Sequence, residues 1–124
     1  MTSGNGEKPY DLEDRTYAFA REVRALVKRL RLTIANQEDI RQLVRASGSV
    51  GSNYIEANES LGKKDFLMHI KISRKESKES RFFLRLLDVE TAMDGDRRKL
   101  AQEALELACI FGAILKRVGG GSES

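Results

Sequence analysis

Apolar residues recur three and four positions apart along most of the chain, the spacing that places side chains on one face of an α-helix. The first such segment predicts a helix over residues 11–31. Its apolar face consists of Leu12, Phe19, Val23, Leu26 and Leu30. After a short break, a second helix is predicted over residues 37–61, with Asn36 as its N-cap. Its inward positions are Leu43, Ser47, Val50, Tyr54, Ala57 and Leu61.

Two further segments have the same periodicity. A third helix is predicted after Gly62, with Asp65 in the first turn, where negative charge is favourable. Its inward face consists of Phe66, Ile70, Ser73, Ser77, Ser80, Leu84 and Leu87. A fourth helix is predicted from about Asp96, after a turn at Asp94 and Gly95. Its inward face consists of Leu100, Ala104, Leu107, Phe111 and Val118.

Four amphipathic helices joined by short loops favour antiparallel neighbours, so the sequence predicts an all-α, up-down four-helix bundle. The bundle is expected over residues 11–118, after a flexible segment at residues 1–10 and before a disordered Gly/Ser tail at residues 119–124. At 124 residues the chain fits one domain. No apolar run approaches the roughly 20 residues of a membrane span, so no membrane association is expected.

Few residues are suited to catalysis or metal binding. The one histidine, His69, stands four residues from Asp65, and two ligands do not make a metal site. The one cysteine, Cys109, is expected to be buried and structural, and the absence of a cysteine pair favours the reducing cytoplasm. The carboxylate pairs Glu56 with Glu59 and Glu76 with Glu79 are interpreted as surface charge or helix-pairing salt bridges. We therefore expect no enzyme, no cofactor and no metal.

Basic residues form two rows at helical spacing, although the net charge is only +3. The row in the third helix is about 20 Å long and consists of Lys71, Arg74, Lys78, Arg81 and Arg85. The first helix repeats the pattern with Arg21, Arg24, Lys28 and Arg31. Such rows suit a phosphate backbone, which needs no particular base contact. They also suit an acidic protein surface, or simply a solvated helix face.

Small residues occupy positions in the second and third helices where larger ones are usual. They are Gly48, Gly51 and Ser52 in the second helix and Ser73, Ser77 and Ser80 in the third. Each mid-helix glycine costs about 1 kcal/mol relative to alanine, so close approach of another helix is expected to offset it. The small faces either pack together within the bundle or form a notch that receives a neighbouring subunit.

The central part of the chain resembles a known bacterial family. The matching residues are 41–57, RQLVRASGSVGSNYIEA, followed by KKDF at residues 63–66. Lys71, the pairs Lys75-Glu76 and Glu79-Ser80, and the opening Asp11-Leu12 continue the match. These residues resemble the four-helix-bundle proteins first noticed as products of intervening sequences in 23S rRNA genes. Gly62 departs from the pattern, where a serine N-cap is expected, but glycine replaces such a cap at a cost of only a few tenths of a kcal/mol.

The resemblance implies a cytoplasmic bundle, often assembled as a homopentamer, with no assigned enzymatic activity. More distant relatives serve reverse transcriptases of retroelements, and we do not carry that role over. The first functional hypothesis is a homo-oligomer that binds RNA or another polyanion through the two basic rows. The second is a protein-interaction scaffold that uses the Gly/Ser-rich groove.

Overall fold

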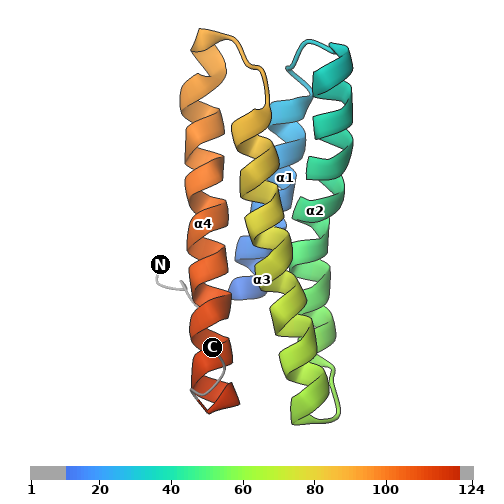
Figure 1. Cartoon of the computed structure of the whole chain (residues 1–124), viewed down its shortest axis with the longest axis vertical. Helices are drawn as coiled ribbons and strands as arrows, with labels where there is room; N and C mark the ends of the chain where they lie inside the picture. Colours follow the sequence, from blue (N-terminus) through green and yellow to red (C-terminus); the bar gives the residue numbers. More distant parts are fainter. Residues whose placement is uncertain (1–10, 121–124) are drawn as a thin grey trace.

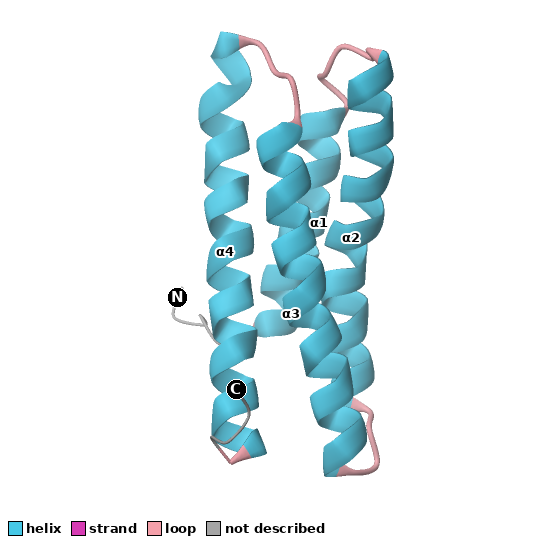
Figure 2. Cartoon of the chain, viewed as in Figure 1, coloured by secondary structure: helices cyan, strands magenta, loops and turns pink. Residues whose placement is uncertain are grey.

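The computed structural model describes residues 11–120, so the expected flexible segment at 1–10 and residues 121–124 of the expected tail lie outside the described residues. Four helices follow one another: α1 (Leu12–Val27), α2 (Ile34–Asn58), α3 (Lys63–Leu86) and α4 (Thr91–Gly119). They run alternately up and down as a bundle, with no strand in residues 11–120 (Figures 1 and 2). The predicted all-α four-helix bundle is confirmed.

The helices are arranged around a square, with α1 and α3 on one diagonal. In Figure 1, α1 lies behind α3, and α3 packs closely between α2 and α4. The first helix packs on α2 and only lightly on α4. Because α1 and α3 lie on a diagonal, the basic residues of these two helices lie on different sides of the bundle.

The buried core follows the predicted periodicity. Of the predicted inward residues, those with little or no exposure include Phe19, Val23, Leu26, Leu43, Val50, Ile70, Leu84, Leu100, Leu107 and Phe111. Tyr54 lies at the edge of the core, its ring centroid 5.9 Å from that of Phe111. Two predicted inward residues lie outside the core. Leu61 is fully exposed in the loop, since α2 ends at Asn58, and Val118 is half-buried in the last turn of α4.

Two predicted boundaries near the first loop are wrong. The first helix ends at Val27 instead of residue 31, because the chain tightens into turns and folds Leu30 into the core. The N-cap of α2 is Thr33, whose hydroxyl oxygen accepts a hydrogen bond from the Asn36 N–H at 3.0 Å. Asn36 itself is buried, and its side chain bonds to both loops at this end of the bundle.

The fourth helix begins earlier than predicted and ends later. It starts at Thr91, so Asp94 and Gly95 lie within its first turns instead of forming a turn before it. The carboxylate of Asp94 pairs with Arg97 and Arg98, three and four residues on, which favours helix at these positions. At the other end, Gly120 caps the helix with φ of +91°, a left-handed conformation that glycine adopts without strain.

Candidate nucleic-acid interface

The basic row of α3 lies along the edge of the helix that borders α4. Lys71, Arg74, Lys78 and Arg85 are exposed, and Arg81 is half-buried. The Arg74 side chain lies over Gly112 of α4, where an added Cβ would stand 3.6 Å from the Arg74 Nε atom. The absence of a side chain at Gly112 therefore gives the arginine a place to lie against α4.

The two carboxylates in the middle of α3 face α2 instead. Glu79 Oε1 lies 3.0 Å from Nη2 of Arg45, and Glu76 Oε1 lies 3.6 Å from Nη1 of the same arginine. Only 7% of the Glu76 side chain is exposed. The predicted helix-pairing salt bridges of these residues are confirmed, and they keep negative charge away from the edge of α3 that borders α4.

Three of the four carboxylates of α4 are also paired away from α3. Glu103 and Glu106 both accept hydrogen bonds from Arg15 of α1, and Asp96 accepts one from Arg29. Asp94 is the fourth: it pairs with Arg97 and Arg98 of its own helix, and Arg97 also donates to the Leu84 and Arg85 carbonyls at the end of α3. Among residues 11–120, no carboxylate lies within 4.0 Å of the guanidinium or ammonium nitrogens of Arg74, Lys78, Arg81 or Arg85. The α3–α4 surface is therefore cationic.

Two of these ion pairs shift the pKa of their members. The hydrogen bonds that Arg15 donates to Glu103, together with the charges of Glu103 and Glu106, raise the pKa of the Arg15 guanidinium, although partial burial opposes the shift. The hydrogen bonds and charges of Arg97 and Arg98 lower the pKa of the Asp94 carboxyl. Both shifts favour the ionised forms of the paired groups.

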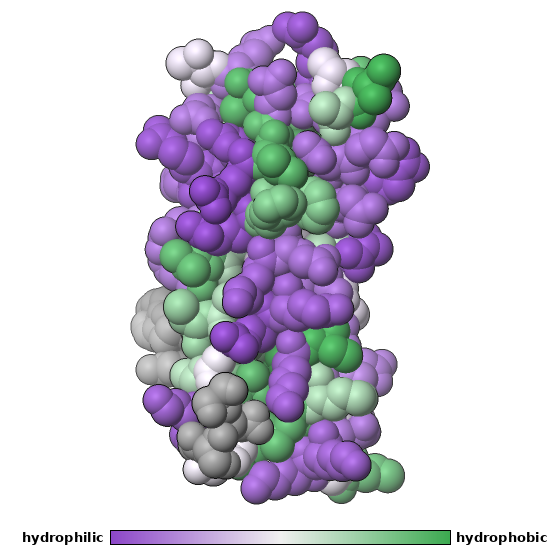
Figure 3. Space-filling model, viewed as in Figure 1, coloured by the Kyte–Doolittle hydropathy of each residue, from purple (hydrophilic) through white to green (hydrophobic). Residues whose placement is uncertain are grey.

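An exposed aromatic ring lies beside the basic row. Phe82 is 56% exposed, and its ring makes an edge contact with Phe83, with 5.3 Å between the centroids. Phe83 in turn packs against the core, so Phe82 has an anchored neighbour. Figure 3 shows a hydrophobic strip over the upper part of α3, bordered by hydrophilic residues. The sequence already indicated an exposed ring beside the basic row, because Phe82 is four residues from Lys78 and three from Arg85, on the polar side of the helix.

The predicted basic row of α1 is shorter than expected and lies elsewhere. Arg31 falls in the loop after α1, with its Nη2 4.0 Å from a Glu90 carboxylate oxygen. Arg24 donates a hydrogen bond to the Ala20 carbonyl and reaches over Gly48 of α2, while Arg21 donates to the Tyr17 hydroxyl and Lys28 is exposed. Because α1 and α3 are diagonal, the structure does not bring the two rows together in one chain.

The serines of α3 are buried inside this chain. Ser73, Ser77 and Ser80 have no exposed surface. The Ser73 hydroxyl donates to the backbone carbonyl of Val50 in α2 at 2.9 Å, and the other two donate to carbonyls four residues earlier in α3. Ser73 thus lets α3 lie close to the backbone of α2, and all three serines are covered by their own chain.

Gly48, Gly51 and Ser52 lie at a groove between α1 and α2 of about 410 Å³. Gly51 is in close contact with α1, since an added Cβ would stand 2.8 Å from the Thr16 hydroxyl oxygen. Ser52 is exposed, and the groove is flanked by two exposed apolar side chains, Tyr17 and Ile55. Gly51 therefore serves packing within the chain, while Ser52 remains accessible from outside.

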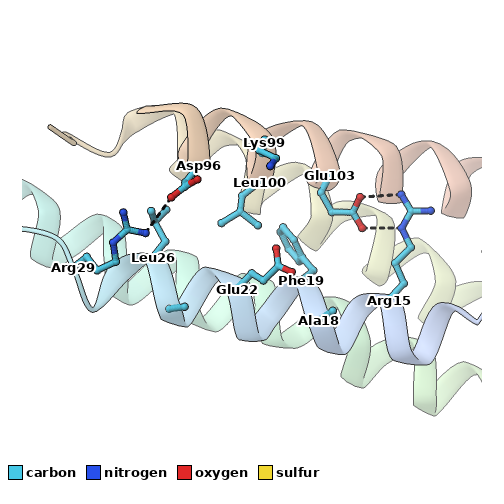
Figure 4. Close-up of a pocket in the computed structure, with 11 residues that line it drawn as sticks. Arg15, Ala18, Phe19, Glu22, Leu26, Arg29, Asp96, Lys99, Leu100 and Glu103 are labelled. Carbon is cyan, nitrogen blue, oxygen red and sulfur yellow. Dashed lines mark hydrogen bonds and ion pairs between the residues drawn. The ribbon is translucent and has the colours of Figure 1, made fainter. Parts of the chain in front are cut away.

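A second groove, of about 460 Å³, lies where α1 packs lightly on α4. In Figure 4 its ends are closed by the ion pairs Arg15–Glu103 and Arg29–Asp96, and Phe19 and Leu100 point toward one another across its floor. Phe19, Leu26 and Leu100 on its floor are buried, whereas Ala18 and Ala25 on its rim are exposed. The sequence did not predict this groove, because the groove depends on the distance between α1 and α4.

Cys109 is not buried, contrary to the prediction. It is exposed, because it lies about half a helical turn from the line of Leu107 and Phe111 that faces the core. His69 Nδ1 lies 3.0 Å from Asn53 Oδ1 of α2, and no cluster of three or more His, Cys, Asp or Glu side chains is arranged for a metal within residues 11–120. None of the helices in the described part of the chain is long and apolar enough to cross a membrane.

Comparison with known proteins identifies the family of this chain. A family model described as 23S rRNA-intervening sequence protein matches residues 10–111. The chain belongs to this family. The chain is also similar in fold to a crystallised protein of unknown function from the S23 ribosomal protein family of Bacteroides thetaiotaomicron. The TM-score is 0.69 at 22% identity, over 84% of this chain and 97% of that one. No match was found among curated proteins.

Proposed function

We propose that this intervening-sequence family protein is a non-enzymatic, cytoplasmic, homo-oligomeric module that binds RNA or another polyanion through the α3–α4 surface. One observation supports it above the others. The cations of α3 border α4, whereas most of the nearby carboxylates are engaged by arginines on the other sides of these helices. Arg45 pairs with Glu76 and Glu79, Arg15 with Glu103 and Glu106, and Arg29 with Asp96. A row of cations at this spacing suits successive phosphates and needs no specific base contact.

The basic row of α1 would support RNA binding only on the surface of a neighbouring chain. A phosphate backbone on the α3–α4 surface of one chain does not reach Arg21 and Lys28 of the same chain, because α1 and α3 are diagonal. In a homo-oligomer, which the family resemblance suggests is a pentamer, a neighbouring α1 row would add to the same surface. Repeated weak sites would then act together through avidity.

The test is a charge reversal with a matched control. Changing Arg74, Lys78 and Arg81 to Glu should abolish binding of a mixed-sequence RNA, while the same change at Arg21, Arg24 and Lys28 should weaken it less. Parent affinity should fall steeply with salt. Light scattering at low and moderate salt measures assembly size and bound RNA mass, and circular dichroism checks the fold. Undiminished RNA binding by the folded α3 variant would contradict the proposal.

A second candidate is a protein-interaction scaffold, favoured by the exposed Tyr17 and Ile55 that flank the groove between α1 and α2. Gly51→Leu is a poor probe of this function, because the added side chain would collide with Thr16 inside the bundle. Ile55→Arg is better, since Ile55 is 45% exposed. This variant should keep its helicity and change assembly size or partner capture. An unchanged assembly and partner set would count against the scaffold.

A further inference from the structure

We propose that Phe82 is a stacking platform for an unpaired base, so that the α3–α4 surface prefers single-stranded nucleic acid to duplex. This inference rests on the proposed function and names its ligand class. Isolated exposed apolar residues are common on proteins and need no ligand. Phe82 combines an aromatic face with cations that adjoin it on its own helix, at Lys78 one turn before and Arg85 one turn after.

The placement of the ring suits stacking. One contact of Phe82 is the edge contact with Phe83, which is packed on the core, and 56% of Phe82 remains open to solvent. A ring with an anchored neighbour loses less freedom when a base stacks on it than one on a mobile loop. Lys78 and Arg85 lie about 6 Å and 4.5 Å along the helix axis from it, within reach of the phosphates of a stacked nucleotide.

Single strands fit this arrangement better than duplexes. In a duplex the faces of the bases are covered by their neighbours, whereas unpaired bases stack on aromatic side chains and tolerate any sequence. The cationic row alone would bind both forms through their phosphates. Phe82 therefore contributes to single-strand binding without contributing to duplex binding, and this difference is what the experiment measures.

Fluorescence anisotropy with a mixed-sequence RNA strand, alone and annealed to its complement, tests the inference. Phe82→Leu keeps an apolar side chain but removes the aromatic face, and should lower single-strand affinity on the order of tenfold while leaving duplex affinity unchanged. Leu86→Ala is the matched control, because Leu86 is also half-exposed, one turn further along α3, and cannot stack. It should leave both affinities unchanged.

A direct signal comes from Phe82→Trp. The chain contains no tryptophan, so the introduced indole is the only one, and its fluorescence should be quenched by the single strand and not by the duplex. Parent-like single-strand affinity in Phe82→Leu, or equal losses for both forms, would overturn the stacking role. A change in assembly size without a change in affinity would instead make Phe82 a contact between copies of the chain, and would also overturn it.

The outcome also separates the inference from the proposed function. If reversal at Arg74, Lys78 and Arg81 abolishes RNA binding while Phe82→Leu has no effect, only the stacking role fails. If the parent protein binds neither form of RNA, both the surface and the stacking role are wrong.

Discussion

The side-chain oxygen of Asn36 accepts a hydrogen bond of 3.0 Å from the backbone N–H of Asp88, 52 residues away in the chain. The same amide donates to the carbonyls of Asp88 and Arg31 at 2.9 and 3.0 Å. One buried side chain thus joins the loop between α1 and α2 to the loop between α3 and α4. It fixes the end of the bundle where both loops lie.

Asn36→Ala should therefore destabilise the protein by about 2–3 kcal/mol, because it removes three part-buried hydrogen bonds that join the two loops. Urea unfolding followed by circular dichroism measures the loss. Asn58→Ala is the control, since Asn58 is exposed at the end of α2, and it should have little effect. Equal midpoints for the two variants would mean that Asn36 does not hold the loops.

Gly51 and Gly95 should respond in opposite directions to substitution by alanine. Gly51→Ala gains helix propensity but places a Cβ 2.8 Å from the Thr16 hydroxyl oxygen and 3.2 Å from Thr16 Cβ. We expect a net loss of about 1–2 kcal/mol. Gly95→Ala meets no atom within 4 Å and should stabilise α4 by up to about 1 kcal/mol.

Thermal or urea unfolding of both glycine variants checks the signs. Adding Thr16→Ala to Gly51→Ala should recover part of the loss, because it removes the atom that the new Cβ meets. A Gly51→Ala variant more stable than the parent would show that α1 moves away from α2 at little cost.

The Asp94 pair predicts a specific pH dependence. Because the folded pKa of Asp94 lies below its ordinary value, ionised Asp94 stabilises the protein at pH values above the ordinary pKa of about 4. This contribution is lost as the pH falls through the lowered folded pKa. The parent should thus be more stable than Asp94→Asn at pH 7, and the difference should shrink in acid. Urea midpoints of both proteins between pH 7 and pH 2.5 measure it, and a pH-independent difference would contradict it.

Helical phase predicted the core well, since a period of 3.6 residues determines which side chains share a face. Phe19, Leu43 and Leu107 were recognisable as buried from their spacing alone. The prediction for Cys109 is wrong because its helical phase, which places it opposite Leu107, decides its exposure and its apolar sequence neighbours do not. Helix ends were less predictable, since contacts distant in sequence, such as Asn36 with Asp88, decide where the loops begin.

The candidate surface was predictable only in part. The spacing of Lys78, Arg81 and Arg85 already indicated a row on one helix edge. Sequence could not show that Glu76 and Glu79 would share Arg45, because that depends on the register between α2 and α3. Nor could it show that the α1 row would lie diagonally opposite.

The light packing of α1 on α4 has a consequence for local opening of the bundle. Contacts with α2 hold α1 more than contacts with α4 do, and at 16 residues it is the shortest of the four described helices. Amide protons of α1 should therefore exchange with solvent through openings of lower free energy than those of α3, which is packed closely on both sides. Native-state hydrogen exchange would then identify α2, α3 and α4 as the most persistent unit of the fold.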